Sequence, residues 1–168
     1  MKNLTYKTKD YVVMAFMVSL GIVLQIADNM LNFIVIPGGK LGLSNIVTQK
    51  NIFVFGGVNA LFISMLRAIL GSLLYGGVST LPYSFFGALF SVLSMWIVKK
   101  IFYPKVSEIG ISVIGAFFHN FAQVLVAVVT FESFSLISYL APLTIISVFA
   151  GIFTGLQVKL LNDKFKII

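Results

Sequence analysis

Hydrophobic runs long enough to cross a bilayer follow one another along almost the whole chain. Of its 168 residues, 59% are hydrophobic and 10% are charged, whereas an average soluble domain carries about 25% charged residues. One span needs about 20 mostly apolar residues, so the chain has room for about six spans and little else. We therefore expect one integral-membrane domain over residues 1–168, an all-α bundle of six transmembrane helices.

Six hydrophobic segments can be placed along the chain. They cover approximately residues 11–28, 41–47, 52–74, 82–98, 109–131 and 136–161. The first lacks a convincing small-residue cleavage site and is interpreted as a retained helix. The second is too short to span unaided, so it is expected to be tilted or partly re-entrant.

The basic residues predict the orientation of this bundle. If both termini are cytoplasmic, ten of the twelve Lys and Arg residues fall on the cytoplasmic side, and Lys40 and Arg67 are the exceptions. Such a bias follows the positive-inside rule. We therefore expect a multi-pass protein of a bacterial cytoplasmic membrane, with both termini inside. The net charge of +7 is interpreted as an orientation signal and a contact for anionic membrane lipid, not for nucleic acid.

The sequence contains few of the residue types that catalysis requires. The chain has no Cys, one His and five dispersed acids, which leaves no thiol nucleophile, no multi-His metal site and no Ser-His-Asp arrangement. Prenyl transfer would need clustered Asp residues to hold magnesium and diphosphate. We expect no catalytic residues, no metal and no intrinsic cofactor.

Arg67 lies inside the third hydrophobic segment, where its charge needs a partner, water or a ligand. Ser64 and Gly71 share its helix face, and Gly71 leaves room for a group close to the backbone. Two interpretations stay open: a structural pair with Asp28 or Glu132, or a site for an anionic ligand.

Two polar groups on other segments are candidates for the same site. Gln25, Asp28, Asn29 and Asn32 follow the i, i+3, i+4, i+7 spacing of one helix face, and either line a cavity or mark a helix end emerging into water. His119, Asn120 and Gln123 lie within one turn of the fifth segment. They either bond neighbouring helices or serve function, because each needs a partner in an apolar interior.

The stretch from Pro37 to Asn45, with the sequence PGGKLGLSN, contains three glycines and a proline, so its backbone conformation matters more than its side chains. Its backbone N–H groups and Lys40 suit an anion, although a tight outer turn explains the glycines equally well. Leu41 follows Gly39-Lys40 where a Walker loop would carry Lys-Ser or Lys-Thr, so this is not an ATP-binding motif.

Taken together, four motifs resemble the Gx transporter family, also labelled heptaprenyl diphosphate synthase component I. They are Pro37 to Asn45, Arg67 to Ser72, Pro82-Tyr83-Ser84 with Gly87-Ala88, and Gly115 to Asn120 with Gln123. The likeness covers roughly residues 20–155. It implies a fold similar to the substrate-binding S components of energy-coupling factor transporters, with a ligand under the loop between the first two helices.

In those transporters a membrane scaffold and two ATPases drive uptake, and the first helix docks on the scaffold through an Ala-xxx-Ala-like surface. Ala15 and Ser19 are the looser counterpart here. The family's settings imply a flavin, a quinone precursor or an isoprenoid as ligand, and the synthase label implies association with a prenyl synthase.

The leading hypothesis is therefore a substrate-binding subunit of an importer for such a molecule. The alternative is a non-transporting membrane partner of a prenyl diphosphate synthase, or of a flavin- or quinone-based electron-transfer protein. The expected binding residues are Asp28, Asn29, Asn32, Lys40, Asn45, Arg67, Tyr83, His119, Asn120 and Gln123.

Overall fold

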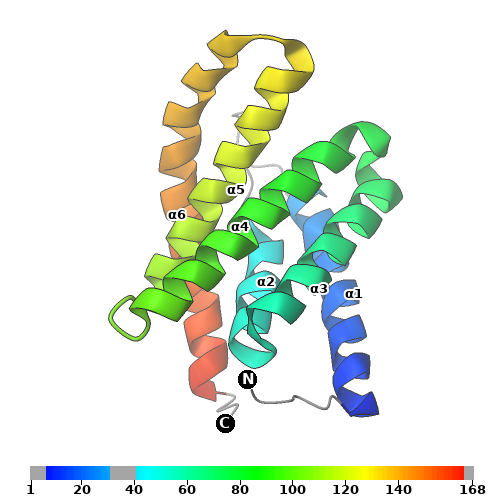
Figure 1. Cartoon of the computed structure of the whole chain (residues 1–168), viewed down its shortest axis with the longest axis vertical. Coiled ribbons are helices and arrows are strands. Elements are labelled where there is room, and N and C mark those ends of the chain that lie inside the picture. The colour runs from blue at the N-terminus through cyan, green and yellow to red at the C-terminus, as the bar shows by residue number, and fades with distance from the viewer. Residues whose placement is uncertain (1–6, 31–40, 165–168) are drawn as a thin grey trace.

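The computed structural model describes residues 7–30 and 41–164, which are mostly helical and contain no β-strand. Its six α-helices are α1 (Thr8–Met30), α2 (Leu43–Val54), α3 (Gly56–Gly71), α4 (Leu81–Phe102), α5 (Glu108–Phe131) and α6 (Leu140–Lys164). Short turns η1 (Ser72–Gly76) and η2 (Val78–Thr80) join α3 to α4, and η3 (Phe134–Tyr139) precedes α6. The helices form a single bundle (Figure 1).

Five helical stretches of the described residues are long and apolar enough to cross a membrane. They contain α1, α3 with η1, η2 with α4, α5, and η3 with α6. The chain is therefore a multi-pass membrane protein. The prediction of six helices is confirmed for the described residues, but the prediction that all six span a membrane is not, because α2 has only 12 residues and is too short to span by itself.

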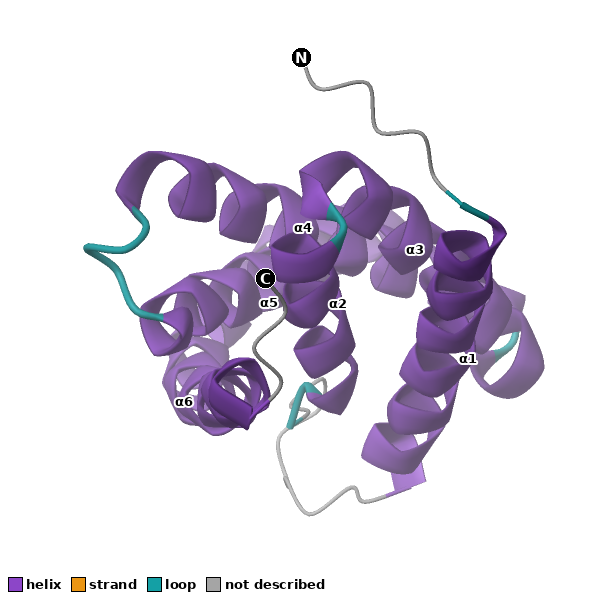
Figure 2. Cartoon of the chain, turned by 90° about the horizontal axis from the view of Figure 1, so that it is seen from below, coloured by secondary structure: helices purple, strands orange, loops and turns teal. Residues whose placement is uncertain are grey.

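Helix α2 is buried in the bundle despite its polar sequence. It packs against all five of the other α-helices, which surround it when the molecule is viewed from one end (Figure 2). Eight of its residues are buried, and Thr48, Gln49 and Asn51 are at most 1% exposed. Thr48 accepts a hydrogen bond from the Ser64 hydroxyl of α3 at 3.2 Å. The bundle is thus built around a polar helix that lipid does not reach.

The boundary between α2 and α3 differs from the sequence prediction. One segment was expected over residues 52–74, but α2 continues to Val54 and α3 begins at Gly56. Gly56 has a φ of 80°, a left-handed conformation that glycine adopts without steric cost. The apolar run hides this break because hydrophobicity continues through it.

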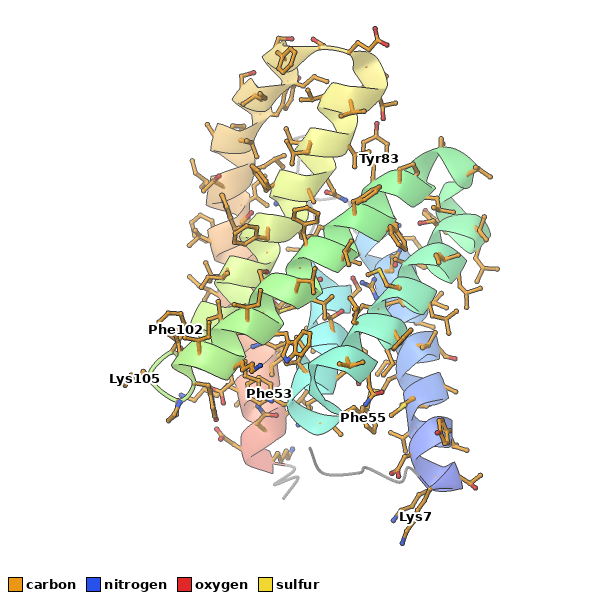
Figure 3. The ribbon with its side chains drawn as sticks, in the orientation of Figure 1. Lys7, Phe53, Phe55, Tyr83, Phe102 and Lys105 are labelled. Carbon is orange, nitrogen blue, oxygen red and sulfur yellow. The ribbon has the colours of Figure 1, made fainter. Side chains whose placement is uncertain are left out.

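The two ends of the bundle differ in charge. The start of α1 and the end of α6 lie at the same end of the molecule (Figure 1). Lys7 and Lys105 mark that end, with Phe55 of the α2–α3 connection (Figure 3). Lys99 and Lys100 are in the last turn of α4, which also ends there. We call this the lysine-rich end; which side of a membrane it faces stays a prediction.

Candidate functional site

A small cavity lies in the half of the bundle away from the lysine-rich end, and side chains from all six α-helices reach it. We call it the chamber. Its volume is about 40 Å³, room for roughly two or three water molecules. It is lined by Gln25, Asp28, Gly42, Ser44, Asn45, Arg67, Ser84, Ala116, His119, Asn120, Gln123 and Ala150. The expectation that Arg67 and His119 meet in one hollow is confirmed.

Arg67 enters the chamber through a reciprocal contact between α1 and α3. Its Nη1 donates a hydrogen bond of 2.8 Å to Oε1 of Gln25. A Cβ at Gly21 of α1 would collide with Cδ of Arg67, and a Cβ at Gly71 of α3 would lie 2.9 Å from Oε1 of Gln25. Each helix therefore carries a glycine at the point where the long polar side chain of the other helix packs against its backbone.

The guanidinium is buried but only partly satisfied. Arg67 is 3% exposed, and within the described residues its Nε and Nη2 have no hydrogen-bond partner. Asp28 lines the same chamber and interacts with Arg67 electrostatically. Glu132, the other expected partner, is exposed at the end of α5. Of the two expected partners, Asp28 therefore acts through its charge, while the hydrogen bond of Arg67 goes to a neutral amide.

Asp28 of α1 binds the backbone at the N-terminus of α2. Its two carboxylate oxygens accept hydrogen bonds of 2.9 Å from the backbone N–H groups of Leu41 and Gly42. Gly42 caps α2 with a φ of 74°, a conformation that favours glycine. The carboxylate therefore positions the start of α2, which carries Ser44 and Asn45 into the chamber wall.

The three polar residues of α5 have different surroundings. His119 lies against Gly87 of α4, where a Cβ would approach the imidazole to 2.9 Å. Asn120 donates to Oγ of Ser147 at 2.9 Å and to the Leu143 carbonyl at 3.3 Å, both on α6. Gln123 is half-buried and lines the chamber. Asn120 therefore ties α5 to α6, while all three side chains contribute to the chamber wall.

The other expected binding residues lie beside the chamber or outside the described residues. Asn45 lines the chamber. Asn29 lines a cleft of about 290 Å³ between α1 and the α3–α4 connection, which shares Gln25 and Ser84 with the chamber. Tyr83 lines a third cavity, next to the chamber. Asn32 and Lys40 lie outside the described residues.

Sequence reasoning did not select several residues of the site. Gly21 precedes Gln25 by one turn, so the stripe of Gln25 and Asp28 could have been extended backwards to it. Gln25 itself was part of that stripe but was not selected as a binding residue. Ser44 and Ser84 stand within motifs that carry the family resemblance, but as small hydroxyl residues they were not selected, and only the folded chain brings them together.

The lysine-rich end also buries cationic groups, but with partners. Lys50 is 7% exposed and donates to Oδ1 of Asn162 at 2.7 Å and to the Leu161 carbonyl at 3.3 Å. Desolvation lowers the pKa of Lys50. Lys99 donates to the Ile52 carbonyl at 2.8 Å and lies 4.2 Å from the centre of the Phe53 ring. These carbonyls belong to the last turns of α6 and α2, where helix dipoles favour a cation.

The geometry can be compared with known families. A family model described as heptaprenyl diphosphate synthase component I matches residues 17–161. The chain belongs to this family. That match confirms the resemblance noted in the sequence and covers every residue named as lining the chamber. No curated protein and no solved structure matches the chain.

Proposed function

We propose that this member of the family is the substrate-binding membrane subunit of an energy-coupling-factor-type importer, and that the chamber captures an anionic group of its ligand. The observation that carries the proposal is Arg67. Its guanidinium is 3% exposed, its one hydrogen bond goes to a neutral amide, and Nε and Nη2 have no partner among the described residues. Unpaired cationic donors are costly in a bilayer, and an anionic ligand would supply their acceptors.

The surrounding residues are suited to binding rather than to reaction. Asn45, His119 and Gln123 line the chamber with amide and imidazole groups, which can hydrogen-bond a polar ligand. Asp28 is engaged with two backbone N–H groups and positions the wall. We propose that the chain is not an enzyme and works by capture and release.

The importer setting is supported by the surface of α1. Ala15 and Ser19 are exposed, and the Ser19 hydroxyl donates to the Ala15 carbonyl at 3.1 Å, so it is satisfied within its own helix. Small side chains on an exposed helix face let another helix approach closely. We propose this face as the docking surface for a transmembrane scaffold with ATPases. With the lysine-rich end in the cytoplasm, the chamber lies in the outer half of the membrane.

A second candidate function is supported by the description of the family. A component of a heptaprenyl diphosphate synthase is expected to associate with other synthase components. In this alternative the chain is a non-transporting membrane partner that positions a prenyl synthase, and the chamber holds a lipid-like molecule as part of that assembly.

The two candidates can be separated by purifying the chain from its native membrane with its partners. The importer proposal predicts co-purification of a scaffold and ATPases, and ATP-dependent uptake in reconstituted vesicles of a small molecule identified by native mass spectrometry. Ala15→Leu together with Ser19→Leu should release the scaffold without emptying the chamber. Recovery of a prenyl synthase, with no ATPase and no uptake, would replace the importer proposal by the second candidate.

A further inference from the structure

A larger, mainly apolar cavity adjoins the chamber. We call it the apolar groove. It has a volume of about 480 Å³ and is lined by Thr80, Tyr83, Ser84, Gln123, Val124, Ala127, Phe131, Leu136, Tyr139 and Leu143. It lies between the start of α4, the second half of α5 and η3. Tyr83 projects from the part of α4 far from the lysine-rich end, in the direction of α5 (Figure 3).

The chamber and the apolar groove are neighbours because they share two wall residues. Ser84 of α4 and Gln123 of α5 line both. Both side chains are half-buried, and both are polar. A molecule that passes between these two side chains would therefore reach the polar chamber at one end and the apolar groove at the other.

The two volumes set the shape of such a molecule. The chamber, at about 40 Å³, is far smaller than the 300–1,000 Å³ typical of small-molecule sites, so it accommodates a compact group and not a fused ring system. The groove, at about 480 Å³, falls within that range. Its walls offer aliphatic and aromatic side chains and few hydrogen-bonding groups, which suits an apolar body.

The charges set the chemistry of the compact end. Nε and Nη2 of Arg67 lack partners within the described residues, and a guanidinium binds phosphate or carboxylate through parallel N–H···O bonds. Asp28 is the acidic group of the chamber wall, so the compact end faces one cation and one anion, with His119 beside them. Because the Asp28 carboxylate repels anions, this balance suits a head with a single phosphate, of about −1 to −2 charge, in preference to a diphosphate.

Resting on the proposed function, we propose that the ligand is an amphiphile, with a compact anionic head in the chamber on Arg67 and a flexible apolar chain in the apolar groove. This class includes prenyl or alkyl monophosphates and anionic membrane lipids, which share the same head and chain chemistry. It does not include a flavin, whose polar ring system would have to occupy the groove.

The test measures binding of radiolabelled farnesyl phosphate to the full-length chain in phosphatidylcholine nanodiscs. Farnesol serves as the uncharged competitor and inorganic phosphate as the competitor without a chain. We expect unlabelled farnesyl phosphate to compete and both partial molecules to fail. Arg67→Gln should weaken binding by roughly 10- to 100-fold, since hydrogen bonds to charged groups contribute about 1.5–3 kcal/mol.

A pair of adjacent substitutions on α5 tests the groove. Ala127→Phe places a ring in the apolar groove, where it takes the space of the ligand's chain, and should reduce binding at least about tenfold, a change of about 1.4 kcal/mol. Val126→Phe places the same ring in a different cavity, on the face shared with Phe86 and Phe90, and should bind like wild type. Melting temperatures show whether each variant is folded.

The outcomes separate this inference from the proposed function. If inorganic phosphate binds in an Arg67-dependent way and Ala127→Phe binds normally, the amphiphile is excluded but anion capture survives. If no anion binding depends on Arg67, both proposals fail. Adding phosphatidylglycerol to the nanodiscs distinguishes the sources: displacement of the label in wild type assigns the site to membrane lipid, and retention assigns it to a prenyl or alkyl phosphate.

Discussion

The two ends of the bundle treat a buried cation in opposite ways. At the lysine-rich end, Lys50 and Lys99 donate to backbone carbonyls of Leu161 and Ile52, in the last turns of α6 and α2. In the chamber, Arg67 has one neutral amide as its hydrogen-bond partner and two nitrogens without one, within the described residues. The lysines donate to the free carbonyls at helix ends, whereas two nitrogens of the arginine have no hydrogen-bond acceptor within the described residues.

This difference distinguishes structural from functional charge in a membrane interior. A lysine that meets a helix C-terminus is stabilised by the dipole and by carbonyls that would otherwise lack donors. An arginine held between two glycines and a glutamine, with Asp28 nearby, is positioned, but within the described residues two of its nitrogens have no hydrogen-bond acceptor. Burial by itself therefore does not identify the site; incomplete satisfaction of the buried group does.

The largest effect is expected at Arg67. Arg67→Gln removes the anion-binding donors, and the small molecule retained through purification should be lost or reduced by roughly 10- to 100-fold. Stability should change little, because removing a poorly satisfied buried charge also removes its desolvation penalty. Native mass spectrometry measures the first and thermal melting the second. A large fall in melting temperature with the ligand still bound would make Arg67 structural, like the lysines.

The next effect is expected at the glycine that accommodates Arg67. Gly21→Ala would place a Cβ against the Arg67 side chain and push the guanidinium out of position, so ligand binding should fall about tenfold, in the range of overpacking costs. Gly110→Ala is the control, since its Cβ would press only on the end of Val106 near the lysine-rich end. Equal binding in both variants would show that the position of Arg67 is unimportant.

A smaller and different effect is expected at Lys50. Lys50→Met keeps an unbranched side chain but removes the donors to Asn162 and Leu161. The free energy of unfolding should fall by about 1–2 kcal/mol, with ligand binding by the folded protein unchanged. Chemical denaturation in detergent gives the first quantity and the nanodisc assay the second. Loss of binding without loss of stability would contradict the assignment of this end to structure.

The smallest effect is expected at Lys99. Its side chain is half-buried, so water can replace much of what it donates, and Lys99→Met should cost about 0.5–1 kcal/mol of stability. The Phe53 ring keeps an apolar neighbour in this variant. Melting curves of both variants should show a larger fall in melting temperature for Lys50→Met than for Lys99→Met. A larger fall for Lys99→Met would mean that the contact of Lys99 with Phe53 contributes more than the hydrogen bonds of Lys50.

Much of the architecture could be predicted because membrane burial leaves a strong signal. Hydrophobic runs located the helices that span, and the cost of an intramembrane charge pointed to Arg67. The short second segment was recognised as unable to span. The break at Gly56 was missed because hydrophobicity is continuous across it, and only the Gly56-Gly57 pair could have indicated it.

The site was predicted in outline but not in its contacts. Helical spacing placed Asp28 on the right face, and Arg67 and His119 were expected to meet. Charge suggested an acid as the partner of Arg67, and Asp28 does interact with it electrostatically. Its hydrogen bond, however, goes to Gln25, which the close approach of α1 and α3 at Gly21 and Gly71 selects. The apolar groove could not be foreseen, because most of its walls are hydrophobic residues like those of any membrane helix. They line a cavity only because the helices that carry them diverge in the folded chain.

The burial of α2 has a consequence for how the protein is made. A segment of 12 residues that contains Asn45, Gln49, Lys50 and Asn51 is too short and too polar to partition into lipid by itself. It is sheltered by the five long helices, including α5 and α6, which are synthesised after it. During biogenesis α2 must therefore stay at the membrane surface or in the translocation channel until the later helices are inserted. A nascent chain that stops before α5 would lack two of the helices that bury α2 in the folded protein.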